Sequence, residues 1–450
     1  MRSSSTGRTS TITSIFGVWA LFLAFSFLQV GNGLQRVLLA VRGDHEGFGA
    51  SAMGVIMAAH FAGYLLGAKL IPVMLGSVGH IRVFAALASS SSAAVLINAV
   101  LVTTPSWSFV YLVSGLCNAG VFVVLESWLN DRATNETRGS ILGVYMMIMM
   151  GGTAGGQALL NLGSPDAFEL FVLSSVLISL AVVPVTLSAS TSPPMPSDDK
   201  MPLRELYRTI PTAVVGIILC SYVQSAATSM AAVFGTQSGM SSARITVFTS
   251  AAVVGAVLLQ IPLGSLSDRY PRRAVILSVT TVACGLAVAG AITPVTSVVL
   301  IGINMAFGAF VFPLYGQFVA LANDWVPPQK RIGAASALVL ASSFGAMAAP
   351  ISIGIAVESF GPEAYFWSLA VSLGLLALYL SYRIRVRQAV PVHRQSPFQP
   401  IFARSGEIAH SVGRWARHPL AEWNHHLYQH NCEVDERHPS LKTESADEAS

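Results

Sequence analysis

Two ionisable residues that could exchange protons lie inside apolar stretches of the sequence. Glu126 lies near the end of one stretch, and His60 lies near the middle of another. A charge within an apolar span is costly, and imidazole titrates near neutral pH. Both residues are therefore candidates for proton-linked chemistry. The structural alternatives are an ion pair of Glu126 with Arg138 or Arg82, and a satisfied core position for His60.

A second polar group could bind an anion. Asn32, Gln35 and Arg36 lie near the end of the first apolar stretch and share one face of a helix. A guanidinium group with neighbouring amides can donate several hydrogen bonds to a carboxylate. The alternative is that the Arg36 side chain extends along the helix to a polar interface.

Neutral polar side chains in other apolar stretches could bind a polar solute by hydrogen bonds. Amide and phenol groups also join neighbouring helices in an apolar medium, so each residue is equally a candidate for helix packing. The candidates for a solute cavity are Gln157, Gln224, Tyr315 and Gln317.

The composition indicates which elements position these residues. Of the 450 residues, 11% are Asp, Glu, Lys or Arg and 53% are hydrophobic, which leaves too few charges to cover a water-facing surface. The charges cluster in short gaps between apolar stretches of roughly twenty residues, the length that spans a bilayer. The sequence therefore predicts an all-α membrane protein.

Twelve apolar stretches indicate twelve transmembrane helices. A polar segment at 189–208 divides them, which predicts an N-terminal six-helix bundle at 14–188 and a C-terminal one at 209–383. A short N-terminus at 1–13 and a tail at 384–450 complete the predicted organisation. The stretches are 14–38, 50–75, 81–103, 107–129, 139–162, 166–188, 209–234, 243–265, 273–293, 296–322, 331–357 and 363–382.

The distribution of Lys and Arg among alternate loops predicts the orientation. Most loop cations fall on one side of the predicted membrane, whereas the other side holds Arg42 and Arg244, with Arg36 close by. Because cytoplasmic loops carry the excess of basic residues, both termini are expected in the cytoplasm, with the chain in the inner membrane. Contact with anionic lipid is expected from the first basic residues of the tail, which are Arg383, Arg385, Arg387 and Arg394.

The two predicted bundles repeat one another. A shift of about 193 residues places Arg138 on Arg331 and Gly152 on Gly345, each pair at the corresponding helix junction. Repeated bundles related by an axis along the membrane normal are a transporter architecture, with a solute site between them near the midplane.

A motif between predicted helices 8 and 9 identifies a family resemblance. The segment Gly264–Arg273 reads GSLSDRYPRR and resembles the G-x-L-x-D-R-x-G-R-K/R loop of the major facilitator superfamily, with Pro271 in place of the second glycine. The resemblance implies two pseudo-symmetric six-helix bundles and a cytoplasmic gate. Its residues in this segment are Gly264, Asp268, Arg269, Arg272 and Arg273.

The matching segment of the first bundle departs further from the pattern. Only Gly79 and Arg82 are retained, and Gly76 stands where the acidic residue is expected. Arg138 and Arg331, at the two later junctions, complete the predicted gate. The first bundle is therefore not expected to form the full charge network.

Predicted helices 4 and 5 resemble the bacterial YcaD-type branch of the superfamily, through Gly115, Val123–Ser127, Arg138-Gly139 and Tyr145–Met147. Many relatives carry an arginine in helix 4 that is linked to proton coupling, and Tyr111 occupies its place here.

Helix 5 is also similar to the glycine-rich antiporter motif of drug-export branches. Its glycines are Gly143, Gly151, Gly152, Gly155 and Gly156.

These features predict a secondary active transporter for a small solute. The preferred version is proton-coupled export of an amphipathic compound; the alternatives are uptake of a small organic anion and a non-transporting sensor. The sequence has no P-loop and no hydrolase motif, so neither ATP drive within this chain nor enzymatic activity is expected. Its four cysteines show no paired spacing, and no metal, cofactor or nucleic-acid partner is predicted.

Overall fold

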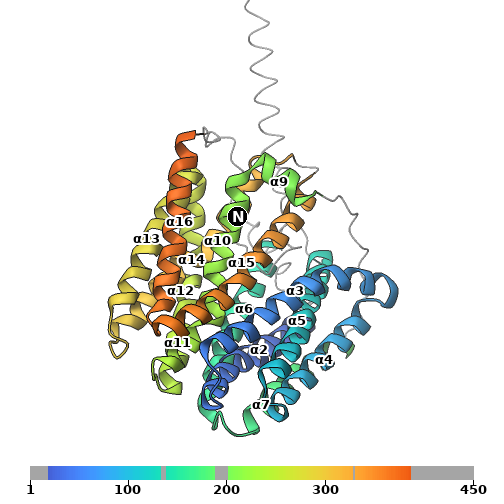
Figure 1. The fold of residues 1–450 in the computed structure, drawn as a ribbon. Helices are drawn as coiled ribbons and strands as arrows, with labels where there is room; N and C mark the ends of the chain where they lie inside the picture. The colour runs from blue at the N-terminus through green and yellow to red at the C-terminus, as the bar shows by residue number, and fades with distance from the viewer. Residues whose placement is uncertain (1–18, 133–137, 188–200, 328–329, 387–450) are drawn as a thin grey trace, which may run out of the picture.

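The chain folds into two six-helix bundles, called here the N-half and the C-half (Figure 1). The computed structural model describes residues 19–132, 138–187, 201–327 and 330–386. The spans of the N-half are α2 (Trp19–His45), α3 (Ala50–Val78), α4 (His80–Val100), α5 (Thr104–Arg132), α6 (Arg138–Ala158), and α7 (Glu169–Leu180) with α8 (Val182–Leu187). Those of the C-half are α10 (Pro211–Ser229) with α11 (Ala231–Gln237), α12 (Ser242–Arg269), α13 (Arg272–Ile292), α14 (Val299–Asn323), α15 (Arg331–Phe360) and α16 (Ala364–Val386).

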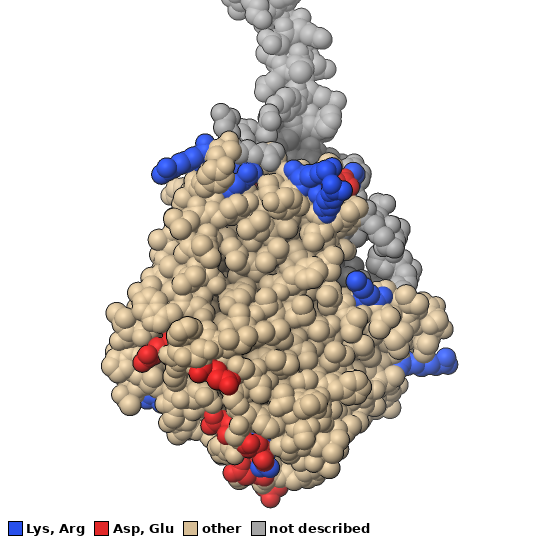
Figure 2. Space-filling view, in the orientation of Figure 1, with Lys and Arg blue, Asp and Glu red and all other residues tan. Residues whose placement is uncertain are grey.

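The surface between the two ends is apolar, as a lipid-facing surface must be. Ten of the described helical spans are long and apolar enough to cross a membrane, and α2 and α6 bring the number to twelve. Val73, Ile261 and Leu378 are each at least 70% exposed, which is favourable only against lipid. In Figure 2, Lys and Arg gather at one end and Asp and Glu at the other. We call these the basic end, where α3 meets α4, and the acidic end, where α15 meets α16.

The first helix is longer than the sequence predicts. It was expected to end at 38, but α2 continues to His45. Leu39, Ala40 and Val41 are buried against neighbouring helices, so the packed face continues past Arg36. As a result, Arg36 lies well inside the bundle instead of at its rim.

The motif segment is also more helical than predicted. Helix α12 runs to Arg269 and α13 begins at Arg272, so only Tyr270 and Pro271 lie between them. An ion pair from Arg272 back to Asp268 spans this junction. The segment predicted as a central loop likewise contains a short helix, α9 (Leu203–Thr209), because Leu206 is fully buried. The first part of that segment lies outside the described residues, as does the predicted tail from residue 387 onward, whereas residues 384–386 continue α16.

Each half contains the same close helix crossing. A Cβ added to Gly115 of α5 would lie 1.9 Å from the carbonyl oxygen of His60 in α3. A Cβ added to Gly308 of α14 would lie 2.0 Å from the carbonyl oxygen of Ala252 in α12. The two glycines are 308 − 115 = 193 residues apart. Only glycine allows this backbone approach, so the pseudo-symmetry is present in the packing as well as in the helix order.

The two halves are joined at the acidic end. Gly54 of α3 packs against the Pro350 carbonyl group of α15, where an added Cβ would lie 2.3 Å from the oxygen. The Ser51 backbone N–H donates to the Glu358 carboxylate at 2.8 Å. Further hydrogen bonds from one half to the other lie between the cavity and this end. These contacts therefore join the two halves at the acidic end.

Candidate functional site

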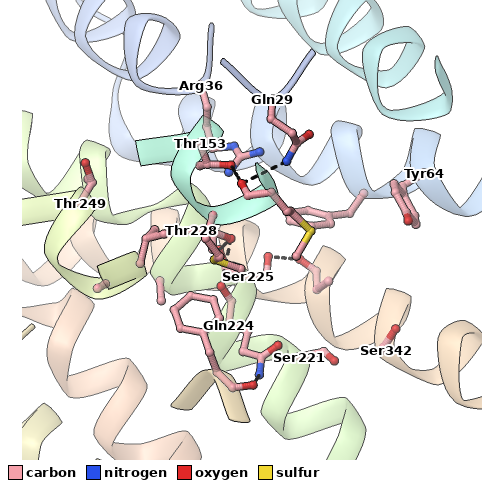
Figure 3. Close-up of a pocket in the computed structure, with 18 of the residues that line it drawn as sticks. Gln29, Arg36, Tyr64, Thr153, Ser221, Gln224, Ser225, Thr228, Thr249 and Ser342 are labelled. Carbon is pink, nitrogen blue, oxygen red and sulfur yellow. Dashed lines mark hydrogen bonds between the residues drawn. The ribbon is translucent and has the colours of Figure 1, made fainter. Parts of the chain in front are cut away.

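A central cavity lies between the halves. Helices α2, α3, α5 and α6 line one side, and α10, α12, α14 and α15 line the other (Figure 3). Its apolar surface includes Phe61, Phe122 and Phe312, and its polar surface consists of hydroxyl groups, amides and one guanidinium group. This lining can bind an apolar body and hydrogen-bond a polar group on the same molecule.

Arg36 is the cation in this lining. It is half-buried in α2, nine residues before the helix ends. Figure 3 shows it near Gln29 and Thr153, whose side chains both donate to the Met149 carbonyl oxygen. The guanidinium group therefore faces a polar patch of the cavity and does not lie at the end of the helix.

Gln157 and Gln224 also line the cavity, and each is held in place. The Gln157 side-chain oxygen accepts hydrogen bonds from the hydroxyl groups of Thr249 and Ser250, across the boundary between the halves. The Gln224 amide nitrogen donates to the carbonyl oxygens of residues 311 and 312 in α14. These contacts fix the orientation of both amide groups.

Four other residues predicted for the cavity lie elsewhere in the structure. Asn32 donates to Asn118 at 2.7 Å within the N-half, and Gln35 is buried at 2% exposure. Tyr315 and Gln317 are buried in α14 and are not part of the lining. Of the three residues 32, 35 and 36 of α2, only Arg36 is part of the cavity lining.

Glu126 lies just beyond the cavity on the side of the basic end. Phe122, one turn earlier in α5, lines the cavity, and so does Met149, one turn after Tyr145 in α6. The Tyr145 hydroxyl group donates to the Glu126 carboxylate at 3.0 Å, and Glu126 is only 2% exposed. The predicted partner Arg82 is exposed and forms no ion pair with a described residue. The side chain of Arg138 lies outside the described residues.

His60 is buried beside the cavity and not in its lining. Its ring centroid lies 4.8 Å from that of Tyr111 in α5, and the next residue, Phe61, lines the cavity. The sequence placed Tyr111 where many relatives have an arginine. The structure places the His60 ring of the neighbouring helix beside Tyr111.

The basic end of the C-half contains a buried charge cluster. Arg272 has 0% side-chain exposure and pairs with Asp324 at 2.8 Å and with Asp268 at 3.2 Å. Its Nε also donates to the Ser267 hydroxyl group. Asp324 has 1% side-chain exposure, so this pair is withdrawn from solvent.

The other predicted gate residues of the C-half surround this cluster. The Arg273 guanidinium lies 5.6 Å from the centre of the Trp325 ring. Arg331 donates to the backbone carbonyl oxygens of Val326 and Asn323, which ties the start of α15 to the end of α14. Gly264 is buried in α12, and Arg269 is exposed.

The matching junction of the N-half is built differently. Gly79 connects α3 to α4 with a φ of 90°, whereas Pro271 takes a φ of −55° at the corresponding place. The next residue is His80, with its Nε2 3.3 Å from the Ser127 hydroxyl group, where the C-half has Arg272. Both differences follow from the departures already visible in the sequence.

The glycines of α6 fall into two groups. A Cβ on Gly152 or Gly156 would contact α2, at 2.7 Å from Gln29 and 2.1 Å from the Val30 carbonyl oxygen. Gly143, Gly151 and Gly155 have open space at the same position. Only the first group is therefore explained by helix packing.

Several residues of the site were missed from the sequence. Asp324 could have been found, because Asn323-Asp324 repeats Asn130-Asp131 at the same spacing of 193 residues. Gln29 and Thr153 give no such signal, since isolated hydroxyl and amide groups are ordinary in membrane helices. Tyr145 belongs to the segment that carries the family resemblance, but the sequence does not show that it meets Glu126. The hydroxyl groups of the C-half lining were missed for the same reason; they are Ser221, Ser225, Thr228, Thr249, Ser342 and Ser343.

The fold and the cavity between two pseudo-symmetric halves define a class of membrane transport proteins. A family described as Major Facilitator Superfamily matches residues 213–430. A bacterial homologue of the human lysosomal transporter Spinster, in an inward-facing and occupied conformation, shares the fold with a TM-score of 0.70 and 14% identity over 89% of this chain and all of the other. The nucleoside transporter NupG gives a TM-score of 0.67 at 15% identity, covering 82% and 99% of the two chains.

The chain is similar to members of the major facilitator superfamily over most of its length. Among its similar proteins is the uncharacterized MFS-type transporter YcaD of Escherichia fergusonii, 24% identical over 84% of this chain and 96% of the relative. An uncharacterized MFS-type transporter of Yersinia enterocolitica is 22% identical over 85% and 98%. The resemblance to the YcaD-type branch thus extends over nearly the whole length of these relatives.

Proposed function

We propose that the protein is a secondary active transporter that moves a small amphipathic solute by alternating access. The supporting observation is a mixed polar and apolar cavity between two halves whose described contacts lie toward the acidic end. A cavity reached from one end at a time is what alternating access requires. In this proposal the halves, 14–188 and 209–383, are the moving bodies.

The proposed orientation of the protein in the membrane is based on the distribution of Lys and Arg. The basic end carries the excess of Lys and Arg, so we place it in the cytoplasm of a cell with an inner membrane, together with both termini. The structure then corresponds to a cytoplasm-facing state, in which the solute enters from inside and export follows. Movement in the opposite direction uses the same states.

Proton coupling is proposed through Glu126. A carboxylate at 2% exposure, one turn from the cavity lining, can change its charge when the cavity opens to water. The Tyr145 hydroxyl group can stabilise the ionised form by its hydrogen bond. His60 is the second candidate, since it lies beside the cavity and an imidazole group can bind a proton.

A non-transporting sensor is the competing function. Its support is the N-half junction, where Gly76 and His80 replace the charged residues of the motif. Such a protein would bind a ligand in the cavity without moving it across the membrane. The names of the structural neighbours, a nucleoside transporter and a lysosomal transporter homologue, favour transport of a small solute.

Liposomes allow two points to be tested together: that the protein transports a solute, and that transport requires the cavity to open in turn at the basic end and at the acidic end. The panel contains an amphipathic cation (ethidium), a neutral nucleoside (uridine) and an amphipathic anion (octanoate). In a background with Cys284 and Cys432 replaced by alanine, cysteines at Asp44 and Gln237 are bridged by a short bis-methanethiosulfonate reagent. These side chains hydrogen-bond across the halves at 2.6 Å.

The proposal predicts flux of at least one panel compound, loss of that flux after bridging, and recovery on reduction. Binding in detergent persists in the bridged protein, because the basic end stays open. Binding of a panel compound without flux in the unbridged protein would support the sensor and contradict the transporter.

A further inference from the structure

The substrate class of the cavity can be narrowed from Arg36. Its helix continues for nine residues toward the acidic end, which is about 13 Å of helix. At that depth the guanidinium group cannot be treated as a surface charge. It lines a space that Gln29, Thr153 and residues of the opposite half also line.

Arg36 has no partner of its own within the described part of the chain. It forms no ion pair and no hydrogen bond there. By contrast, Arg42, nearer the end of the same helix, pairs with Glu46 and Asp166, and Arg272 pairs with two aspartates. Leaving a half-buried cation unpaired is unfavourable, so its retention in a cavity points to a ligand that supplies the negative charge.

A second donor group lies in the same lining. The Gln157 side-chain oxygen already accepts two hydrogen bonds, from Thr249 and Ser250. Its NH2 group is therefore left to donate elsewhere. Gln157 also lies one turn after Thr153, on the same face of α6.

The opposite half of the cavity contributes no charge. Its polar groups are hydroxyls and one amide, and its apolar surface includes Phe312. With Phe61 and Phe122 from the N-half, this surface suits an aromatic or aliphatic body. One cation matches one negative charge better than two, which favours a carboxylate over a phosphate dianion.

We propose that the cavity binds amphipathic organic monocarboxylates, with the carboxylate on Arg36 and the apolar body against the phenylalanines. This inference rests on the proposed transport function, since it names the solute class of the same cavity. The proposed ligands belong to both solute classes considered from the sequence, because they are amphipathic compounds and also organic anions.

The test compares acids with amides of the same shape. Purified protein is titrated in detergent with benzoate and benzamide, and with octanoate and octanamide, and ligand-dependent thermal stabilisation gives the affinities. The variants are R36Q, R36K and the control R204Q; Arg204 is exposed on α9. The melting temperature without ligand shows that each variant is folded.

The wild-type protein and R204Q are expected to prefer each acid over its amide. R36Q should weaken binding of the acids roughly 10- to 100-fold and leave the amides unchanged, because charge-assisted hydrogen bonds are lost. R36K should retain part of the preference for acids over amides, since lysine keeps the positive charge but cannot form bidentate hydrogen bonds to a carboxylate.

Two outcomes separate this inference from the proposed function. If acids and amides bind alike and R36Q changes neither, while liposomes still transport a panel compound, the carboxylate site is refuted and transport stands. If Arg36-dependent acid binding occurs but no compound moves, the site is supported and the proposed transport is refuted.

Discussion

At the basic end of the C-half, Arg272 is fully buried between Asp268 and Asp324, whereas the matching junction of the N-half has Gly79 and His80 in a different backbone conformation. Yet both halves keep the same glycine-mediated helix crossing. The comparison shows that the close helix crossing requires glycine at the same position in both halves. Charged positions, in contrast, have diverged.

The cavity shows the reverse distribution of charge. Its C-half lining is neutral, while the N-half supplies Arg36 to the lining and Glu126 just beyond it. We infer that the charged residues of the two halves have different roles. The ion-pair cluster of the C-half stabilises the structure, whereas the charged residues of the N-half take part in solute binding and proton coupling.

The largest expected effect comes from breaking the buried pair of the C-half. D324N leaves the Arg272 charge without its best partner at 0% exposure, and such a loss destabilises proteins by about 3–5 kcal/mol. Thermal unfolding in detergent measures the change. The control D268N removes a partner that is 38% exposed and should cost clearly less. Equal melting of D324N and wild-type protein would contradict a structural role for the cluster.

A smaller effect, equal in the two halves, is expected at the helix crossings. G115A and G308A each place a methyl group within 2.0 Å of a carbonyl oxygen, which forces the helices apart and costs typically about 1–3 kcal/mol. The control G302A, on the same helix as Gly308, meets open space and should melt like the wild type. The shared-packing account fails if only one of the two variants is destabilised.

The smallest effect is expected at the acidic end, where Glu358 accepts a hydrogen bond from Ser51 of the other half. E358Q keeps the shape but removes the charge near the start of α3, so closure of this end should weaken slightly. The yield of bridging between cysteines at positions 44 and 237 should fall by less than about threefold. E363Q, at the same end and exposed, is the control; an equal fall there would show that the Ser51 contact is irrelevant.

Much of the architecture was predictable from the sequence. The twelve spans, the repeat and the family follow from hydropathy and from the motif at Gly264–Arg273, because the membrane imposes the length and composition of each helix. The structure confirms the fold class, and the comparisons agree with the family resemblance. The helix ends were less predictable, since the burial of Leu39 to Val41 depends on contacts with distant helices.

The site was predictable only in part. Arg36, Gln157 and Gln224 were named and do line the cavity, but Asn32, Gln35, Tyr315 and Gln317 do not. Which face of a helix meets the cavity depends on how both halves pack. The packing of the halves cannot be inferred from the local sequence. Nor does the local sequence show that Asp324 pairs with Arg272, which is 52 residues away in the chain.

The most direct test of the division between the halves is the ratio of protons to solute moved in liposomes. Octanoate flux and proton flux, followed with an internal pH dye, are compared for wild-type protein, E126Q and D268N. E126Q is expected to abolish the proton flux while octanoate exchange continues, and D268N is expected to slow both fluxes without changing their ratio. An unchanged ratio in E126Q, or an altered ratio in D268N, would contradict this division between the halves.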